Sequence, residues 1–142
     1  MVLGSFPDVC VGNVDRSVDF YRSLLGLQVL IDHGWYVELG IPGRTLLALV
    51  QRGHETVPLV AHTEPRGVLL SFEVDDAAAV ATNATRMECM AIVDLVTELG
   101  QRHLMVLDPD GAVVDVIERV ALGTTDLRRL ATDRRQHLRA TT

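Results

Sequence analysis

Histidine and carboxylate side chains are the groups in this sequence that could carry acid–base or metal chemistry. The histidines are His33, His54, His62, His103 and His137, and none has the HxH or HxxxH spacing of a metal-binding pair. Only His103 falls on an expected strand of the second half, where an imidazole could act as a general base near neutral pH. Because a single strand histidine is more often structural, both roles stay open for His103.

The two cysteines, Cys10 and Cys89, give little support for thiol chemistry. They form no C-x-x-C motif and no cluster with histidine, so the sequence predicts neither a disulfide framework nor a zinc site. No basic residue adjoins Cys10 to lower the pKa of its thiol, and no Ser-His or Cys-His nucleophile pair is visible. We expect two free thiols.

Charge is distributed unevenly along the 142 residues. Residues 1–118 hold 7 Arg against 17 acidic residues, whereas residues 119–142 hold 6 Arg against 2. An acidic body repels phosphate backbones and favours cationic small molecules, so we expect no nucleic-acid partner. The sequence shows no secretory leader and no apolar stretch long enough to cross a membrane, which predicts a cytoplasmic protein without a membrane partner.

Short strands and amphipathic helices must position these side chains. The first half predicts a strand, then a helix between Asn13 and Gly26, then three further strands. The second half predicts the same order, with a helix from Asp76 to about Met90 and a turn at residues 108–111. The strands are expected at residues 8–12, 27–32, 35–39, 45–50, 67–74, 91–97, 102–107 and 112–118. The order β-α-β-β-β therefore occurs twice.

The repeat defines the domain organisation. Residues 1–120 form one domain, with a first module at about 5–51, a linker at 52–66 and a second module at about 67–118. Residues 121–142 form a basic tail, with an amphipathic helix expected at 125–139. This helix could bind a membrane or an acidic groove, but packing on its own acidic body or on a sister subunit fits the charge distribution better.

Two sequence strings carry a family resemblance. They are Val11-x-Asn13-Val14-x-x-Ser17-x-x-Phe20-Tyr21-x-x-Leu24-Leu25-Gly26 in the first half, and Phe72-x-Val74-x-Asp76 with Asp108-Pro-Asp-Gly111 in the second. Over residues 6–118 the sequence resembles the vicinal oxygen chelate superfamily, which includes glyoxalase I, extradiol dioxygenases, fosfomycin-resistance enzymes and bleomycin-resistance proteins. The resemblance implies an α+β fold in which two βαβββ modules form a curled sheet around a cavity.

The resemblance also places the four metal-ligand positions of the family at about Phe6, Ala48, Leu69 and Asp115. Three of these residues offer no lone pair to a metal, so we expect no metal cofactor of the family type. A divalent metal would need displaced ligands, for which Asp8, Glu73, His103 and Asp115 are the candidates.

If Phe6 and Leu69 face the cavity, strand alternation assigns the rest of its lining. The expected ligand-binding residues are Phe6, Asp8, Cys10, Trp35, Leu46, Ala48, Leu69, Ser71, Glu73, Val113, Asp115 and Ile117. Asp8, Glu73 and Asp115 would converge on one pocket that suits an apolar ligand with a cationic group. In the alternative, these carboxylates lie at strand ends in water or pair with Arg16, Arg66 or Arg102. Trp35 could cap the cavity and stack on a planar ligand, or simply pack on the core.

The sequence leaves three functions open. The first is a metal-free protein that binds or sequesters a small molecule, as bleomycin-resistance proteins do. The second is a metal-dependent lyase, isomerase or dioxygenase of the glyoxalase or dioxygenase type, in which His103 and Asp115 are the candidate catalytic residues. The third is a non-catalytic scaffold or regulatory domain. We also expect a homodimer, because the sheet edges need cover.

Overall fold

The computed structural model describes residues 1–140, and within them the expected repeat is present. The first module comprises β1 (Asp8–Val11), α1 (Val14–Leu25), β2 (Gln28–Asp32), β3 (Tyr36–Ile41) and β4 (Arg44–Gln51). The second comprises β5 (Leu69–Glu73), α2 (Ala77–Arg86), β6 (Ala91–Glu98), β7 (Gln101–Leu107) and β8 (Val113–Arg119). A short 3-10 turn, η1 (Leu59–Ala61), lies in the linker, and α3 (Thr124–Ala140) forms the tail. The predicted α+β class and the helical tail are confirmed, with strand ends shifted by one or two residues.

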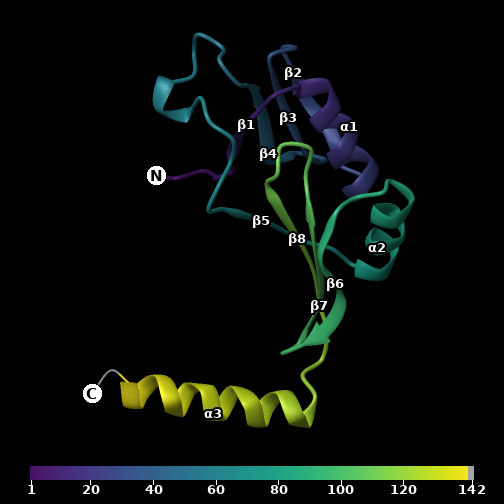
Figure 1. Ribbon diagram of the computed structural model, residues 1–142, viewed down its shortest axis with the longest axis vertical. Coiled ribbons are helices and arrows are strands. Elements are labelled where there is room, and N and C mark those ends of the chain that lie inside the picture. Colours follow the sequence, from purple (N-terminus) through teal and green to yellow (C-terminus); the bar gives the residue numbers. More distant parts are fainter. Residues whose placement is uncertain (141–142) are drawn as a thin grey trace.

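Each module forms its own four-stranded mixed sheet within the described residues. The strand orders are β1-β4-β3-β2 and β5-β8-β7-β6, so the first and last strands of each module are parallel neighbours. The register places Asp8 opposite Ala48 in the first sheet and Ser71 opposite Asp115 in the second. Helices α1 and α2 lie together on one side of the strands (Figure 1).

Local signals set the ends of both helices. The Asn13 side chain accepts a hydrogen bond from the backbone N–H of Arg16, and Gly26 ends α1 with a φ of 69°. The Asp76 side chain accepts from the N–H of Ala79 at the start of α2. Helix α2 ends at Arg86 rather than at the predicted Met90, because Glu88 adopts a left-handed φ of 55° that reverses the chain.

The turn between β7 and β8 joins the two modules. Asp110 accepts hydrogen bonds from the backbone N–H of Gly12 (2.8 Å) and from the Arg52 guanidinium (2.9 Å). Asp108 accepts one from the hydroxyl of Tyr21 (2.8 Å), a side chain with no exposed surface. We refer to Asp108 and Asp110 as the module clamp. The clamp and the α1–α2 contact leave the other faces of both sheets open, so the expected curled sheet does not close around one cavity.

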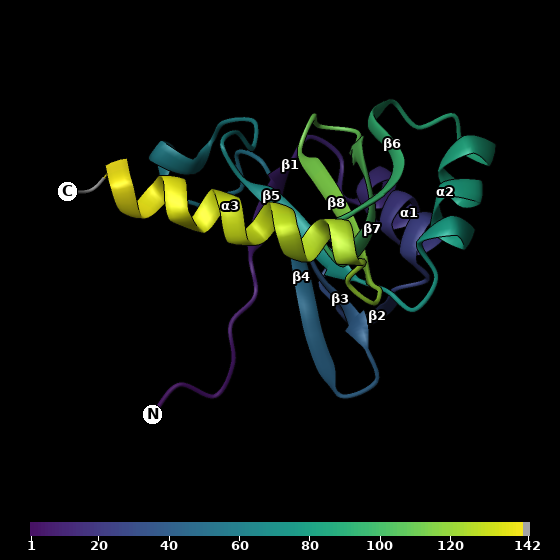
Figure 2. The same ribbon diagram turned by 90° about the horizontal axis from the view of Figure 1, so that it is seen from below.

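The tail helix stands away from the body. It runs outward from the end of the second sheet, on the side opposite α1 and α2 (Figures 1 and 2). Asp126 accepts the N–H of Gly123 within the tail and the N–H of Leu99 in the β6–β7 hairpin. Arg129 forms an exposed ion pair with Glu98. None of the helices in the described residues is long and apolar enough to cross a membrane.

Candidate functional site

A hollow of about 610 Å³ lies between β1, the linker and the start of the second module. Seven of its twelve lining residues carry hydrocarbon side chains, and its charged members come from β1 and the linker. The lining residues are Pro7, Asp8, Val9, Cys10, Ala61, Thr63, Glu64, Pro65, Arg66, Val68, Leu70 and Ala112. A site of this size accommodates a drug-sized ligand.

A second hollow of about 600 Å³ adjoins the first. It shares Pro7, Val68 and Leu70 with the first hollow, and β5 and β4 supply most of its remaining wall. Its other lining residues are Ile41, Arg44, Leu46, Leu69, Ser71, Phe72 and Glu73. The two hollows together are called the trough below.

Acidic and thiol groups at the β1 end of the trough are shifted toward their neutral forms. Burial and then the nearby Glu38 carboxylate raise the pKa of Asp8. Burial also raises the pKa of the Cys10 thiol, against an opposing effect of Arg52. Glu38 accepts hydrogen bonds from the hydroxyls of Tyr36 (3.0 Å) and Thr45 (2.6 Å). Burial and the bond to Glu38 raise the pKa of Tyr36 to about 12. Burial at this end of the trough therefore disfavours the ionised forms of Asp8 and Cys10.

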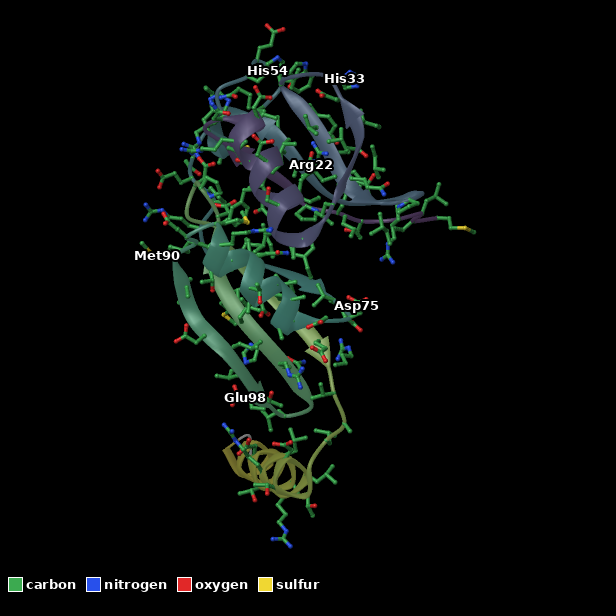
Figure 3. All side chains as sticks on the ribbon, turned by 90° about the vertical axis from the view of Figure 1, so that its right-hand side faces the viewer. Arg22, His33, His54, Asp75, Met90 and Glu98 are labelled. Atoms are coloured by element: carbon green, nitrogen blue, oxygen red, sulfur yellow. The ribbon has the colours of Figure 1, made fainter. Side chains whose placement is uncertain are left out.

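A row of polar side chains crosses the second sheet. The Ser71 hydroxyl donates to Asp115 Oδ2 at 3.2 Å. His103 Nδ1 lies 3.7 Å from Asp115 Oδ1, and His103 Nε2 lies 3.5 Å from Glu98 Oε1. Glu98 is at the far end of β6, near the tail helix (Figure 3). Asp115 is buried, and its Oδ1 has no hydrogen-bond partner.

The structure brings about half of the expected ligand-binding residues to the trough. Those that line it are Asp8, Cys10, Leu46, Leu69, Ser71 and Glu73. Phe6 precedes β1 with its ring partly exposed, whereas Ala48 is completely covered. Val113, Asp115 and Ile117 lie on β8, the strand that pairs with β5, and line neither hollow.

The three expected carboxylates do not converge on one pocket. Asp8 lines the first hollow, whereas Asp115 lies on the strand next to Ser71 and accepts a hydrogen bond from its hydroxyl. Glu73 pairs with the Arg119 guanidinium at 3.0 Å, because both residues stand at the exposed ends of the parallel strands β5 and β8. Glu73 is therefore paired with an arginine, but the partner is Arg119 rather than Arg16, Arg66 or Arg102.

Trp35 lies outside the trough. Its ring stacks on the His54 ring, with centroids 3.9 Å apart and planes 2° from parallel. His33 and His54 lie at the same end of the molecule, beyond the first sheet (Figure 3). One face of Trp35 is thus covered by a side chain of this chain rather than open to a trough ligand.

The residues at the family's metal positions do not fit a metal. Phe6, Ala48 and Leu69 carry no donor atom, which leaves the Asp115 carboxylate alone. Among the side chains that the structure describes, moreover, no three from His, Cys, Asp or Glu are grouped closely enough to hold an ion. The displaced candidates are also separate, since Asp8 lies on the first sheet and Glu73 is bound to Arg119.

Sequence reasoning missed the contribution of the linker. Ala61, Thr63, Glu64, Pro65 and Arg66 form one wall of the first hollow, although their segment has no periodic pattern. Its cluster of apolar residues and prolines in an otherwise polar connection was the available signal.

Comparisons with known proteins agree with this fold. A family model described as a glyoxalase-like domain matches residues 6–121. The phenazine antibiotic resistance protein EhpR of Enterobacter agglomerans is 28% identical over 110 residues, which cover 76% of this chain and 85% of EhpR.

Solved structures give the same result. A protein of unknown function from Agrobacterium tumefaciens str. C58 has a TM-score of 0.71 at 28% identity, covering 84% of this chain and 96% of its own. Lactoylglutathione lyase from Agrobacterium tumefaciens has a TM-score of 0.62 at 20% identity, covering 82% and 94% respectively. At this identity, the similarity to lactoylglutathione lyase shows a shared fold and nothing more.

Proposed function

The chain belongs to the glyoxalase-like domain family, and we propose that it is a resistance-type member that binds a planar aromatic small molecule in the trough without chemistry and without a metal. The resemblance to the vicinal oxygen chelate superfamily is confirmed by the family match. The similarity to a phenazine resistance protein supports a ligand of the phenazine type, which has three fused rings.

The apolar first hollow is the observation that carries this proposal. Its volume of about 610 Å³ falls in the range of small-molecule sites, and Val68 offers exposed hydrocarbon to a ring system beside the largely buried Val9 and Leu70. Burial of aromatic surface against such a wall would supply most of the binding free energy. Few polar groups are needed, and they would set the orientation of the ligand.

The donor chemistry of the site supports metal-free binding. Asp115 is the sole family-position residue with a donor side chain, and the Ser71 hydroxyl already occupies one of its oxygens. Elemental analysis of protein purified without chelator tests this part of the proposal. A near-stoichiometric content of Zn, Mn, Fe or Ni would contradict it.

We also propose a homodimer. In each sheet one face is left open, and strands β2 and β6 have free outer edges in the described residues. Ile31 on β2 and Ile92 on β6 are exposed apolar side chains, which favours cover by a second copy of the chain. Analytical ultracentrifugation tests the assembly, and a monomer at micromolar concentration would contradict it.

Protection of Cys10 from alkylation tests ligand binding in the trough. Cys10 lines the first hollow, whereas Cys89 lies beside α2 in a hollow of about 90 Å³, which is too small for three fused rings. Two single-thiol variants, Cys89→Ser and Cys10→Ser, report on these places separately.

Phenazine should slow the reaction of iodoacetamide with Cys10 in the Cys89→Ser protein. It should leave the reaction with Cys89 in the Cys10→Ser protein unchanged. Equal rates with and without phenazine at Cys10, or equal protection of both thiols, would overturn the proposed site.

A further inference from the structure

Ser71 presents its hydroxyl oxygen to the second hollow as a hydrogen-bond acceptor. It lies at the centre of β5 with its side chain exposed, and its hydroxyl donates to Asp115 Oδ2 at 3.2 Å. A serine hydroxyl has one proton and two lone pairs. Because the proton is directed to Asp115, only lone pairs face the trough. Ser71 therefore acts as an acceptor there.

Asp115, on the neighbouring strand β8, keeps the Ser71 hydroxyl in this orientation. It is 7% exposed and directly opposite Ser71 in the β5–β8 register. An ionised carboxylate can only accept hydrogen bonds, so it cannot donate to Ser71 in return. Its second oxygen has no partner, and His103 stands 3.7 Å away on the side opposite Ser71. The Ser71 hydroxyl is thus the side-chain donor that is hydrogen-bonded to the Asp115 carboxylate among the described residues.

The other charged groups of the second hollow do not compete with Ser71 at its centre. Glu73 is paired with Arg119 at the strand end. Arg44 begins β4, and its side chain is exposed beside the β3–β4 turn. Leu46 and Leu69 line the same hollow with hydrocarbon. A ligand that places an acceptor or a negative charge beside Ser71, away from Arg44, would meet lone pairs and apolar surface.

We propose that Ser71, positioned by Asp115, makes the trough select aromatic ligands that carry an N–H or O–H donor and reject those with a carboxylate at the same place. The inference rests on the proposed function, because it requires an aromatic ligand in the trough. It assigns ligand contact to Ser71 and a positioning role to Asp115.

Three matched probes test the selection: phenazine, 1-aminophenazine and phenazine-1-carboxylic acid. They share one ring system and differ only in the group at one ring position. Equilibrium dialysis with absorbance detection should give a dissociation constant for the amine that is about tenfold lower than that for the carboxylate, as one directed hydrogen bond warrants. Unsubstituted phenazine should lie between the two.

Variants separate the inference from the proposed function. Ser71→Ala and Asp115→Asn should each reduce the amine-to-carboxylate preference to about twofold or less while phenazine binding persists. Asp94→Asn is the control for charge, because Asp94 is exposed on β6 away from the trough, and it should retain the preference. A loss of folded protein would change the apparent dissociation constants of both probes by the same factor and would leave their ratio unchanged. A merely structural role of Asp115 would therefore leave the amine-to-carboxylate preference unchanged.

The outcomes are distinct. Equal binding of amine and carboxylate by the parent protein, or an unchanged preference in Ser71→Ala, overturns the inference and leaves the proposed function standing. Failure of all three probes to bind overturns both. A preference that disappears in Ser71→Ala and Asp115→Asn but persists in Asp94→Asn supports the inference.

Discussion

Replacing Asp110 by asparagine should weaken the contact between the modules. The Asp110 side chain is 5% exposed and accepts hydrogen bonds from the Gly12 N–H and from Arg52, whose side chain is 25% exposed. Removal of one charge from a buried pair destabilises proteins by about 3–5 kcal/mol. Because Arg52 is partly solvated and asparagine still offers one acceptor oxygen, we expect a loss of about 2–3 kcal/mol.

Urea denaturation followed by circular dichroism measures this loss. At roughly 3 °C per kcal/mol for a domain of this size, the melting temperature should also fall by about 6–9 °C. Glu64→Gln is the matched control, because it breaks an ion pair of similar length with Arg66 in which both side chains are largely exposed. That control should change stability by less than about 0.5 kcal/mol. An Asp110→Asn protein as stable as the control would refute the role given to the clamp.

Two further changes probe buried polar groups. Tyr21→Phe removes the hydroxyl that donates to Asp108 Oδ2 and should lower the free energy of unfolding by about 1–3 kcal/mol in the same urea assay; an unchanged value would contradict the buried bond. Asp8→Asn should raise stability near pH 7 by a few tenths of a kcal/mol, since the partly solvated Asp8 is penalised for ionising in the fold. The raised pKa of Asp8 means that its contribution to stability is complete below the ordinary range of an aspartate and is lost as pH rises through the raised value. The gain in Asp8→Asn should therefore vanish on acidification, and a gain that is independent of pH would contradict this cause.

The repeated architecture was predictable because its signals are local. Asn13 and Gly26 mark the ends of α1 by their own hydrogen-bonding and backbone preferences, and both act as expected. The end of α2 was misplaced because no glycine or proline marks it. Glu88 takes the left-handed conformation instead, and Cys89 donates its N–H back to the Ala84 carbonyl. A chain reversal that is stabilised by such contacts leaves no distinctive residue in the sequence.

The site was only partly predictable, because the alternation of side chains along a strand shows which residues share a face of the sheet but not how far apart they lie. Of the residues that it assigned to the cavity face, Asp8, Cys10 and Ser71 line the trough. It could not predict that Glu73 meets Arg119, because that contact depends on the β5–β8 register. The Asp108-Pro-Asp-Gly111 string predicted a turn, whereas its second role as the module clamp depends on contacts with residues about 60 to 100 positions away. Such contacts are visible only after the modules are assembled.

Calorimetric titration of phenazine into chelator-treated protein tests the central claim most directly. The account predicts saturable binding with one ligand per chain. The affinity should be the same before and after addition of Zn²⁺ or Mn²⁺, since Asp115 alone does not form a metal site. Absence of binding, or binding that appears only after a metal is added, would contradict a metal-free aromatic site in the trough.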